Sequence, residues 1–306
     1  MSRTLAVGLD IGTWETKVVV CEHARDTNKK DIFKIVATGK AETRGMRHGY
    51  VAHADEVVKS IESAIFAAEK SLGTPIKRVF LSVGGIGLGS AISIGTSVIS
   101  RADSEITMLD IDKAMEASQH TLPEAATINR KIIHTIPLSY KIDGKPALGN
   151  PIGMKGMKLE VKTLFITCLD HHLNDLIEAI EEAGLEVVDV TPSPFAAAHV
   201  MLTKAQRIAG CVLANIGSET VSIAVYENNT PLSLEVFPIG SNDITNDIAL
   251  GLRIPLEEAE QVKLGSVVGG NYPKKKLDDI VGARLSDIFE LIEAHLKKIG
   301  KSGLLP

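Results

Sequence analysis

The chain has 306 residues, with 33 Lys and Arg against 38 Asp and Glu and a hydrophobic content of 44%. This length predicts two lobes, and such ordinary globular composition excludes disorder, collagen and coiled coil. The net charge of −5 argues against a nucleic-acid partner. The longest N-terminal apolar stretch, Leu5 to Leu9, ends at Asp10 and is too short for a signal peptide, so we expect a cytoplasmic protein.

The pattern along the chain is that of an α/β protein, because short β-branched runs alternate with amphipathic helices. In the first part we predict a helix over His53–Leu72, ended by Gly73. A helix over Leu173–Ala183 and a strand over Glu186–Val190 belong to the same part. Its other predicted strands are Leu5–Asp10, Lys17–Cys21, Thr38–Glu42 and Val79–Val83.

A small α+β domain is predicted between these segments, where the sequence changes in character. Its expected elements are strands over Ser90–Ser100 and Ile132–Ile142, a helix near Asp110–Gln119 and a turn-rich loop, Asp143–Met157. We place the first lobe at residues 1–83 and 165–193, the inserted domain at 84–164 and the second lobe at 194–306.

The second lobe is expected to begin with strands and to end with helices. We interpret Lys274–Lys276 as a solvated loop. The predicted strands are Cys211–Ala214, Val221–Tyr226 and Leu232–Pro238, and the predicted helices are Ile244–Gly251, Leu256–Leu264 and Arg284–Ile299.

An internal repeat points to a function. Val7–Thr13 aligns without a gap with Val212–Ser218, at an offset of 205 residues. In both copies an apolar strand ends in Asp or Asn, a Gly and a hydroxyl residue follow, and a second apolar strand begins. We interpret them as two β-hairpins whose turns present N–H groups and hydroxyls to an anion, with glycine permitting close approach and positive φ. Facing each other, they could clamp a polyphosphate.

Other phosphate-binding loops fit poorly. Walker and dinucleotide-binding motifs open a helix, whereas a strand follows both of these turns. The glycine-rich run Gly84–Gly89 precedes β-rich sequence, so we interpret it as a domain-junction loop. Trp14 either borders the cleft or caps the first hairpin, and we favour the cap.

With both hairpins placed, the chain resembles the actin-like ATPase superfamily, and within it the FtsA family of bacterial cell-division proteins. The second likeness rests on Asn150–Met154 with Gly156 and Leu159–Val161, on Ile244–Ala249 and on Ala259–Lys263. The resemblance implies an actin-like (ribonuclease H-like) two-lobe α/β fold. An SHS2-like subdomain, 1C, is inserted in the first lobe, 1A, and the second lobe comprises 2A and 2B.

The resemblance also implies ATP and magnesium as cofactors. Asp10 would hold magnesium through water, and with Asn215 it occupies the candidate catalytic positions. The residues expected to contact the nucleotide are Gly12, Thr13 and Lys17 from one lobe and Gly217, Ser218, Gly240, Glu260 and Lys263 from the other. Glu260 and Lys263, one helical turn apart, match a ribose- and adenine-side pair, although an exposed ion pair is the alternative.

Two departures from the family pattern bear on function. Asn215 stands where the family usually has Asp, and because an amide is no base, ATP binding could persist while hydrolysis becomes slow or absent. The sequence stops at Pro306, before the family's adenosine loop and membrane-binding helix. We therefore expect a C-terminally truncated chain with an incomplete second lobe, whose membrane contact needs that absent helix.

The function implied is that of an adaptor that polymerises and links FtsZ filaments to the cytoplasmic membrane at the septum. Arg284 would receive the acidic C-terminal tail of FtsZ, with a solvated arginine as the alternative, and subdomain 1C would contact other division proteins. A pilus-assembly-type adaptor and a small-molecule kinase remain alternatives, although the kinase would need a carboxylate base that we do not find. His120 and His171–His172 lack metal-ligand spacing, and Ser82 and Ser193 lack a nucleophile elbow.

Overall fold

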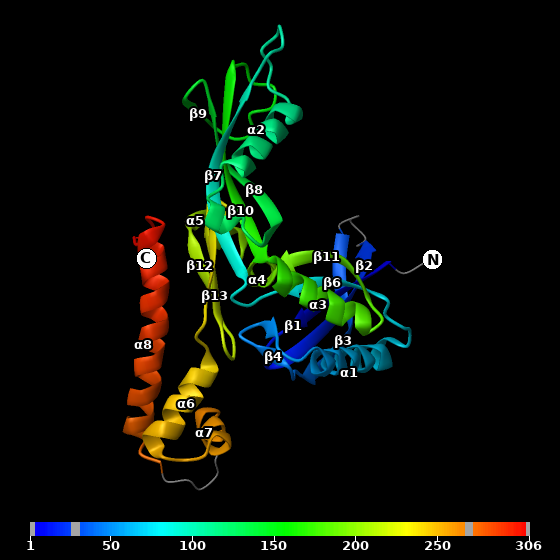
Figure 1. Ribbon diagram of the computed structural model, residues 1–306, viewed down its shortest axis with the longest axis vertical. Coiled ribbons are helices and arrows are strands. Elements are labelled where there is room, and N and C mark those ends of the chain that lie inside the picture. Colours follow the sequence, from blue (N-terminus) through cyan, green and yellow to red (C-terminus); the bar gives the residue numbers. More distant parts are fainter. Residues whose placement is uncertain (1–3, 26–30, 267–271, 304–306) are drawn as a thin grey trace.

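The computed structural model describes residues 4–25, 31–266 and 272–303 (Figure 1). Its first sheet has five strands in the order β11-β6-β1-β2-β3. The first three strands in sequence form an antiparallel meander, and β6 and β11 continue the sheet in parallel. The strands are β1 (Thr4–Ile11), β2 (Glu15–Arg25), β3 (Asp31–Glu42), β6 (Arg78–Val83) and β11 (Glu186–Pro192).

One face of this sheet is buried beneath two helices, α1 (Ala54–Leu72) and α3 (Asp170–Glu182). Alternate residues of the strands supply the core, among them Val7, Leu9, Val18, Val20 and Leu81. α1 lies so close to β3 that a Cβ at Gly39 would be 2.0 Å from the Ala64 carbonyl oxygen. Gly73 ends α1 at φ 77°, as predicted. A short hairpin, β4 (Met46–Arg47) and β5 (Tyr50–Val51), leads from β3 to α1.

A second, antiparallel sheet in the order β7-β10-β8-β9 stands between β6 and α3 in sequence. Its elements are β7 (Leu88–Val98), α2 (Met108–His120), the 3-10 helix η1 (Glu124–Ala126), β8 (Arg130–Ile142), β9 (Lys145–Ala147) and β10 (Lys158–Leu169). α2 covers one face of the sheet, where Ile111 and Ala114 pack near Leu159 and Val161. β10 had not been predicted as a strand.

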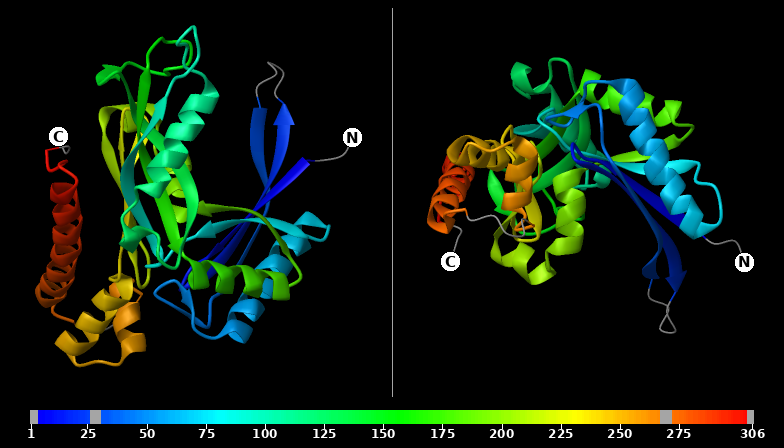
Figure 2. Two further views of the ribbon diagram at one scale, coloured as in Figure 1. Left: turned by 45° about the horizontal axis from the view of Figure 1, so that its top comes forward. Right: turned by 90° about the horizontal axis from the view of Figure 1, so that it is seen from below.

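The third sheet, β12-β13-β14, is antiparallel and buried on both faces of its central strand. Its strands are β12 (Cys211–Ile216), β13 (Val221–Glu227) and β14 (Thr230–Phe237). The long helix α8 (Lys274–Lys298) runs along one face (Figures 1 and 2), where Ile288 and Ile292 join Ile223 and Val225 in a core. The other face meets α4 (Ser193–Met201) and α5 (Lys204–Ala209).

α6 (Ser241–Leu252) and α7 (Leu256–Lys263) follow β14 and form a smaller core with the start of α8. The predicted start of the last helix at Arg284 is wrong. α8 begins at Lys274, after Pro273, because Leu277 and Ile280 pack into this core. The expectation of a loop over Lys274–Lys276 is therefore wrong too.

Candidate functional site

The two repeated hairpins share one register in the structure. In the first, β1 pairs with β2 so that Asp10 lies opposite Lys17. In the second, β12 pairs with β13 so that Asn215 lies opposite Ser222. Both pairs keep the offset of 205 residues, so the repeat inferred from sequence is also a repeat of backbone structure. The lysine occurs in the first copy alone.

Each turn contains a glycine for the same steric reason. The Gly12 N–H donates to the Glu15 carbonyl over 3.3 Å, and the Gly217 N–H donates to the Thr220 carbonyl over 2.8 Å. A Cβ added at either glycine would lie 3.0 Å from that carbonyl oxygen. Neither glycine has a positive φ, so that expectation is wrong for both. Glycine is needed here because the turn closes tightly on its own backbone.

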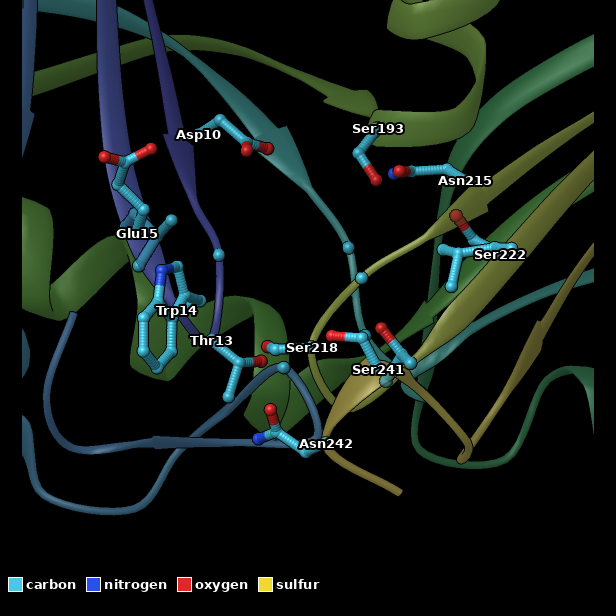
Figure 3. A pocket seen from close by; sticks show the side chains of 18 of the residues that line it. Asp10, Thr13, Trp14, Glu15, Ser193, Asn215, Ser218, Ser222, Ser241 and Asn242 are labelled. Atoms are coloured by element: carbon cyan, nitrogen blue, oxygen red, sulfur yellow. The ribbon is translucent and has the colours of Figure 1, made fainter. Parts of the chain in front are cut away.

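The hairpins face each other across a cleft of about 340 Å³. Figure 3 shows Asp10, Thr13 and Trp14 on one wall and Asn215 and Ser218 on the other. Hydroxyl groups and glycine backbone dominate the lining, which also includes Gly12, Glu15, Lys17, Gly49, Gly84, Gly85, Ser193, Gly217, Thr220, Ser222, Ser241, Asn242 and Glu260. Such a lining suits a ligand with many oxygen acceptors.

Asp10 is the carboxylate at the end of β1. Burial raises the pKa of the Asp10 carboxyl, while a hydrogen bond with Ser82 and the charge of Lys17 act in the opposite direction. Lys17 keeps 56% of its side chain exposed, and its ammonium lies 3.7 Å from the Glu15 carboxylate. Lys40 also pairs with Glu15 at 3.2 Å, so two ammonium groups share this one carboxylate.

The second hairpin rests on the start of α6. A Cβ at Gly240 would lie 2.4 Å from the Ser218 carbonyl oxygen, so this glycine permits close contact. The N–H groups of Ser241 and Asn242 donate to the carbonyls of Gly217 and Ser218, each over 2.8 Å. Gly240 thus supports the turn, and the next two residues line the cleft.

Glu260 and Lys263 form the ion pair that their spacing indicates, at 2.6 Å. Thr245 joins them, because its hydroxyl donates to Glu260 at 2.6 Å and accepts from Lys263 at 2.8 Å. Glu260 lines the cleft, whereas Lys263 is absent from the described lining and also donates to the Ser241 carbonyl at 3.2 Å.

A direct contact joins the two lobes beside the cleft. The His48 backbone N–H donates to the Glu219 carboxylate over 2.5 Å, and His48 Nδ1 lies 3.2 Å from the Glu219 carbonyl oxygen. His48 sits in the β4–β5 turn at φ 49°, an uncommon conformation for a residue other than glycine. We call this contact the clasp. Neither residue had been singled out from sequence, since nothing local marks a contact across 171 positions.

Sequence reasoning also missed part of the cleft floor. The loop at Gly84 and Gly85, expected to serve as a domain junction, lines the cleft. A Cβ at Gly49 would lie 2.3 Å from the Gly85 Cα, so two backbones meet there. Ser193 begins α4 and points toward Asn215 (Figure 3). Trp14, for which we favoured a capping role, is 62% exposed and borders the cleft.

Arg284 lies away from the described cleft lining, within α8. Its guanidinium binds Asp247 through Nε at 2.7 Å and Nη2 at 3.0 Å, and it lies 3.3 Å from Asp287. The Asp247 hydrogen bonds raise the pKa of Arg284 further. The arginine is therefore already paired.

In the parts of the chain that the structure describes, no group of three or more His, Cys, Asp or Glu side chains is arranged to bind a metal, so the histidines there form no metal centre. His172 is fully buried, and burial lowers its pKa. Its Nε2 donates to the Gly84 carbonyl over 2.9 Å, which places this imidazole beneath the cleft floor. None of the described helices is long and apolar enough to cross a membrane.

Comparison with solved structures defines the class of protein. A PilM–PilN type IV pilus biogenesis complex matches with a TM-score of 0.66 at 18% identity, over 97% of this chain and 77% of that one. The ethanolamine utilization protein EutJ from Carboxydothermus hydrogenoformans matches with a TM-score of 0.53 at 16% identity, over 97% and 73%. The fold is therefore actin-like, and residues 89–167 match the SHS2 domain that is inserted in FtsA.

Sequence comparison gives the family. Residues 212–300 match the family described as cell division protein FtsA. The FtsA protein of Bacillus subtilis (strain 168) is 32% identical over 99% of this chain and 72% of its own length. That of Pseudomonas aeruginosa is 29% identical over 100% and 76%. The chain belongs to the FtsA family of actin-like cell-division proteins.

Proposed function

We propose that the chain binds ATP with magnesium between the two hairpins. The observation that carries this proposal is the repeated hairpin, with one register and one turn hydrogen bond, on both walls of a single cleft. A polyphosphate needs N–H and O–H donors from more than one side, and two such turns provide them. Proteins with the actin-like ATPase fold generally bind nucleotide with a divalent metal.

The side chains fit such a ligand. Thr13 and Ser218 offer hydroxyls from opposite walls, and Lys17 offers a cation to the phosphates. Asp10 would hold the hydration water of magnesium, which supplies charge neutralisation at the phosphates when bound. The raised pKa of Asp10 fits a buried carboxylate whose negative charge a cation would stabilise.

Asn215 sets the expected rate of hydrolysis. Its side chain lies at the end of β12, exposed in the cleft, where an aspartate could orient and polarise a water. The amide can hydrogen-bond a water but takes no proton from it. We therefore expect nucleotide binding with slow turnover, as suits a scaffold switched by nucleotide occupancy.

Membership of the FtsA family supports a wider role. We propose that the protein self-associates and links FtsZ filaments to the cytoplasmic membrane at the division site. Arg284 would receive the acidic FtsZ tail by exchanging its Asp247 carboxylate for one of the peptide. Such an exchange keeps the guanidinium paired throughout, which lowers its energetic cost.

Two titrations test these roles. A fluorescent ATP analogue with magnesium should bind at micromolar concentration, and Asp10→Ala should abolish binding; no binding to the unchanged chain would overturn the nucleotide proposal. A labelled FtsZ tail peptide should bind, with affinity reduced in Arg284→Ala and retained in the control Arg253→Ala, which alters an exposed arginine at the end of α6. Equal affinity in both variants would remove Arg284 from the tail site.

A further inference from the structure

A second cavity, of about 330 Å³ and of mixed polar and apolar lining, lies between β8 of the inserted sheet, α4 and the third sheet. It shares no lining residue with the cleft. Its polar lining includes His134 from β8, His199 from α4, Arg207 from α5 and Tyr226 from β13. The volume is at the lower end of the range of small-molecule sites, about 300 Å³ and upward.

Arg207 is held in a fixed orientation at this cavity. Its Nε donates to Asn229 Oδ1 over 3.1 Å, and Nη1 donates to the carbonyls of Ala198 and Leu202, each over 3.3 Å. The Nη2 group keeps two N–H donors outside these bonds. Within the described ranges Arg207 forms no ion pair, although it is only partly exposed.

The remaining groups add donors without adding negative charge. Among the residues that the structure describes, no Asp or Glu lines the cavity, whereas the hydroxyls of Thr135 and Thr191 do. Tyr226 is 3% exposed, and burial raises its pKa, so its phenol stays neutral and can donate. A fixed guanidinium, the N–H groups of two imidazoles and several hydroxyls make a complementary environment for an oxyanion.

We propose that this cavity binds the phosphate or carboxylate group of a small molecule, held by Arg207 together with His134 and His199. The site is independent of the nucleotide cleft, but the two are mechanically connected. α4 carries Ser193 of the cleft at its first position and His199 of the cavity six residues later, and α4 joins the first lobe to the second. An anion in the cavity would therefore favour particular positions of α4.

Nuclear magnetic resonance of the histidine side chains tests the site directly. Inorganic phosphate and succinate are titrated separately into the full chain at millimolar concentration, and the His134 and His199 signals are assigned with His134→Gln and His199→Gln. We expect a saturable shift of both signals with at least one probe, since a bound anion changes the electrostatic environment of both imidazole rings. A shift with inorganic phosphate alone would indicate a phosphate ligand, and a shift with succinate alone would indicate a carboxylate ligand.

Variants locate the response. Arg207→Gln should abolish it, and Arg207→Lys, which keeps the charge but loses the planar donor fork, should weaken it about tenfold or more. Arg78→Gln, which removes an exposed arginine from its ion pair with Glu186, should leave it unchanged, as should Lys17→Gln in the cleft. Absence of a saturable shift with both probes, or a shift in folded Arg207→Gln as large as in the unchanged chain, would overturn the proposal.

Coupling to the cleft rests on the proposed nucleotide function and is measured separately. The affinity for the ATP analogue should change when the cavity is saturated with the probe that acts, and should not change in Arg207→Gln. If the chain binds no nucleotide, the histidine signals still report on the cavity, so the two proposals fail independently.

Discussion

The clasp between His48 and Glu219 should govern how tightly the cleft holds its ligand. Glu219→Gln keeps the size of the side chain but replaces a charge-assisted hydrogen bond, 2.5 Å long, by a neutral one. Hydrogen bonds to charged groups contribute about 1.5–3 kcal/mol and neutral ones about 0.5–1.5, so the closed arrangement should lose about 1–1.5 kcal/mol. Because about 1.4 kcal/mol is a factor of ten, the affinity for magnesium and the ATP analogue should fall about five- to tenfold.

A second variant separates the clasp from simple charge. Any carboxylate removed near the cleft lowers repulsion toward a polyphosphate and so raises affinity. Glu257→Gln makes the same change of charge in a neighbouring pocket that Glu219 also lines, with no described partner across the lobes. We therefore expect Glu257→Gln to bind as tightly as the unchanged chain or more tightly, and Glu219→Gln more weakly.

Equilibrium fluorescence titration at fixed ionic strength provides the comparison. Equal affinities of Glu219→Gln and Glu257→Gln for the ATP analogue would show that the clasp does not help to close the cleft. Glu219→Ala extends the series, because it leaves the His48 N–H unpaired and should cost more than the glutamine.

Three further predictions concern turnover and stability. Asn215→Asp should raise phosphate release in a magnesium-dependent assay, because it restores a carboxylate where the amide takes no proton; an unchanged rate would show that this position does not limit hydrolysis. Asp10→Asn should increase the free energy of unfolding at neutral pH while abolishing magnesium-dependent binding. Burial raises the pKa of Asp10 in the folded chain, so the charged carboxylate destabilises the fold at pH values above that pKa. The stability gained by Asp10→Asn should therefore disappear in acid below the pKa of Asp10 in the unfolded chain, because the carboxyl is then protonated in both the folded and the unfolded chain. Denaturation measured at a series of pH values checks this sign. Gly39→Ala should destabilise by about 3 kcal/mol because its Cβ would lie 2.0 Å from the Ala64 carbonyl, whereas Gly282→Ala, in open space within α8, should stabilise by about 0.5–1 kcal/mol; equal effects in urea would contradict the packing of α1 on β3.

Much of the fold could be predicted because its signals are local. Short apolar, β-branched runs indicated β1 and β2, and helical spacing with Gly73 indicated α1. The repeat around Asp10 and Asn215 went further, since two copies of one strand-turn-strand pattern predicted two similar hairpins in opposite lobes.

The parts that could not be predicted depend on contacts between distant segments. α4 is rich in alanine and lies, only partly buried, between the first and third sheets, and its apolar residues form no clear stripe. The clasp joins His48 to Glu219 across the lobes, and Gly84 reaches the cleft only because β6 lies beside β1. These residues contribute to the site because of where the fold places them, and their local sequence contains no motif that predicts this.

We have proposed that the two hairpins hold one polyphosphate between them. A crystal structure of the chain grown with magnesium and a non-hydrolysable ATP analogue tests it most directly. We predict phosphate oxygens within hydrogen-bond distance of both turns, at Gly12–Thr13 and at Gly217–Ser218, with a magnesium-bound water on Asp10. A nucleotide that touches only one hairpin, or that lies outside the cleft, would contradict the account.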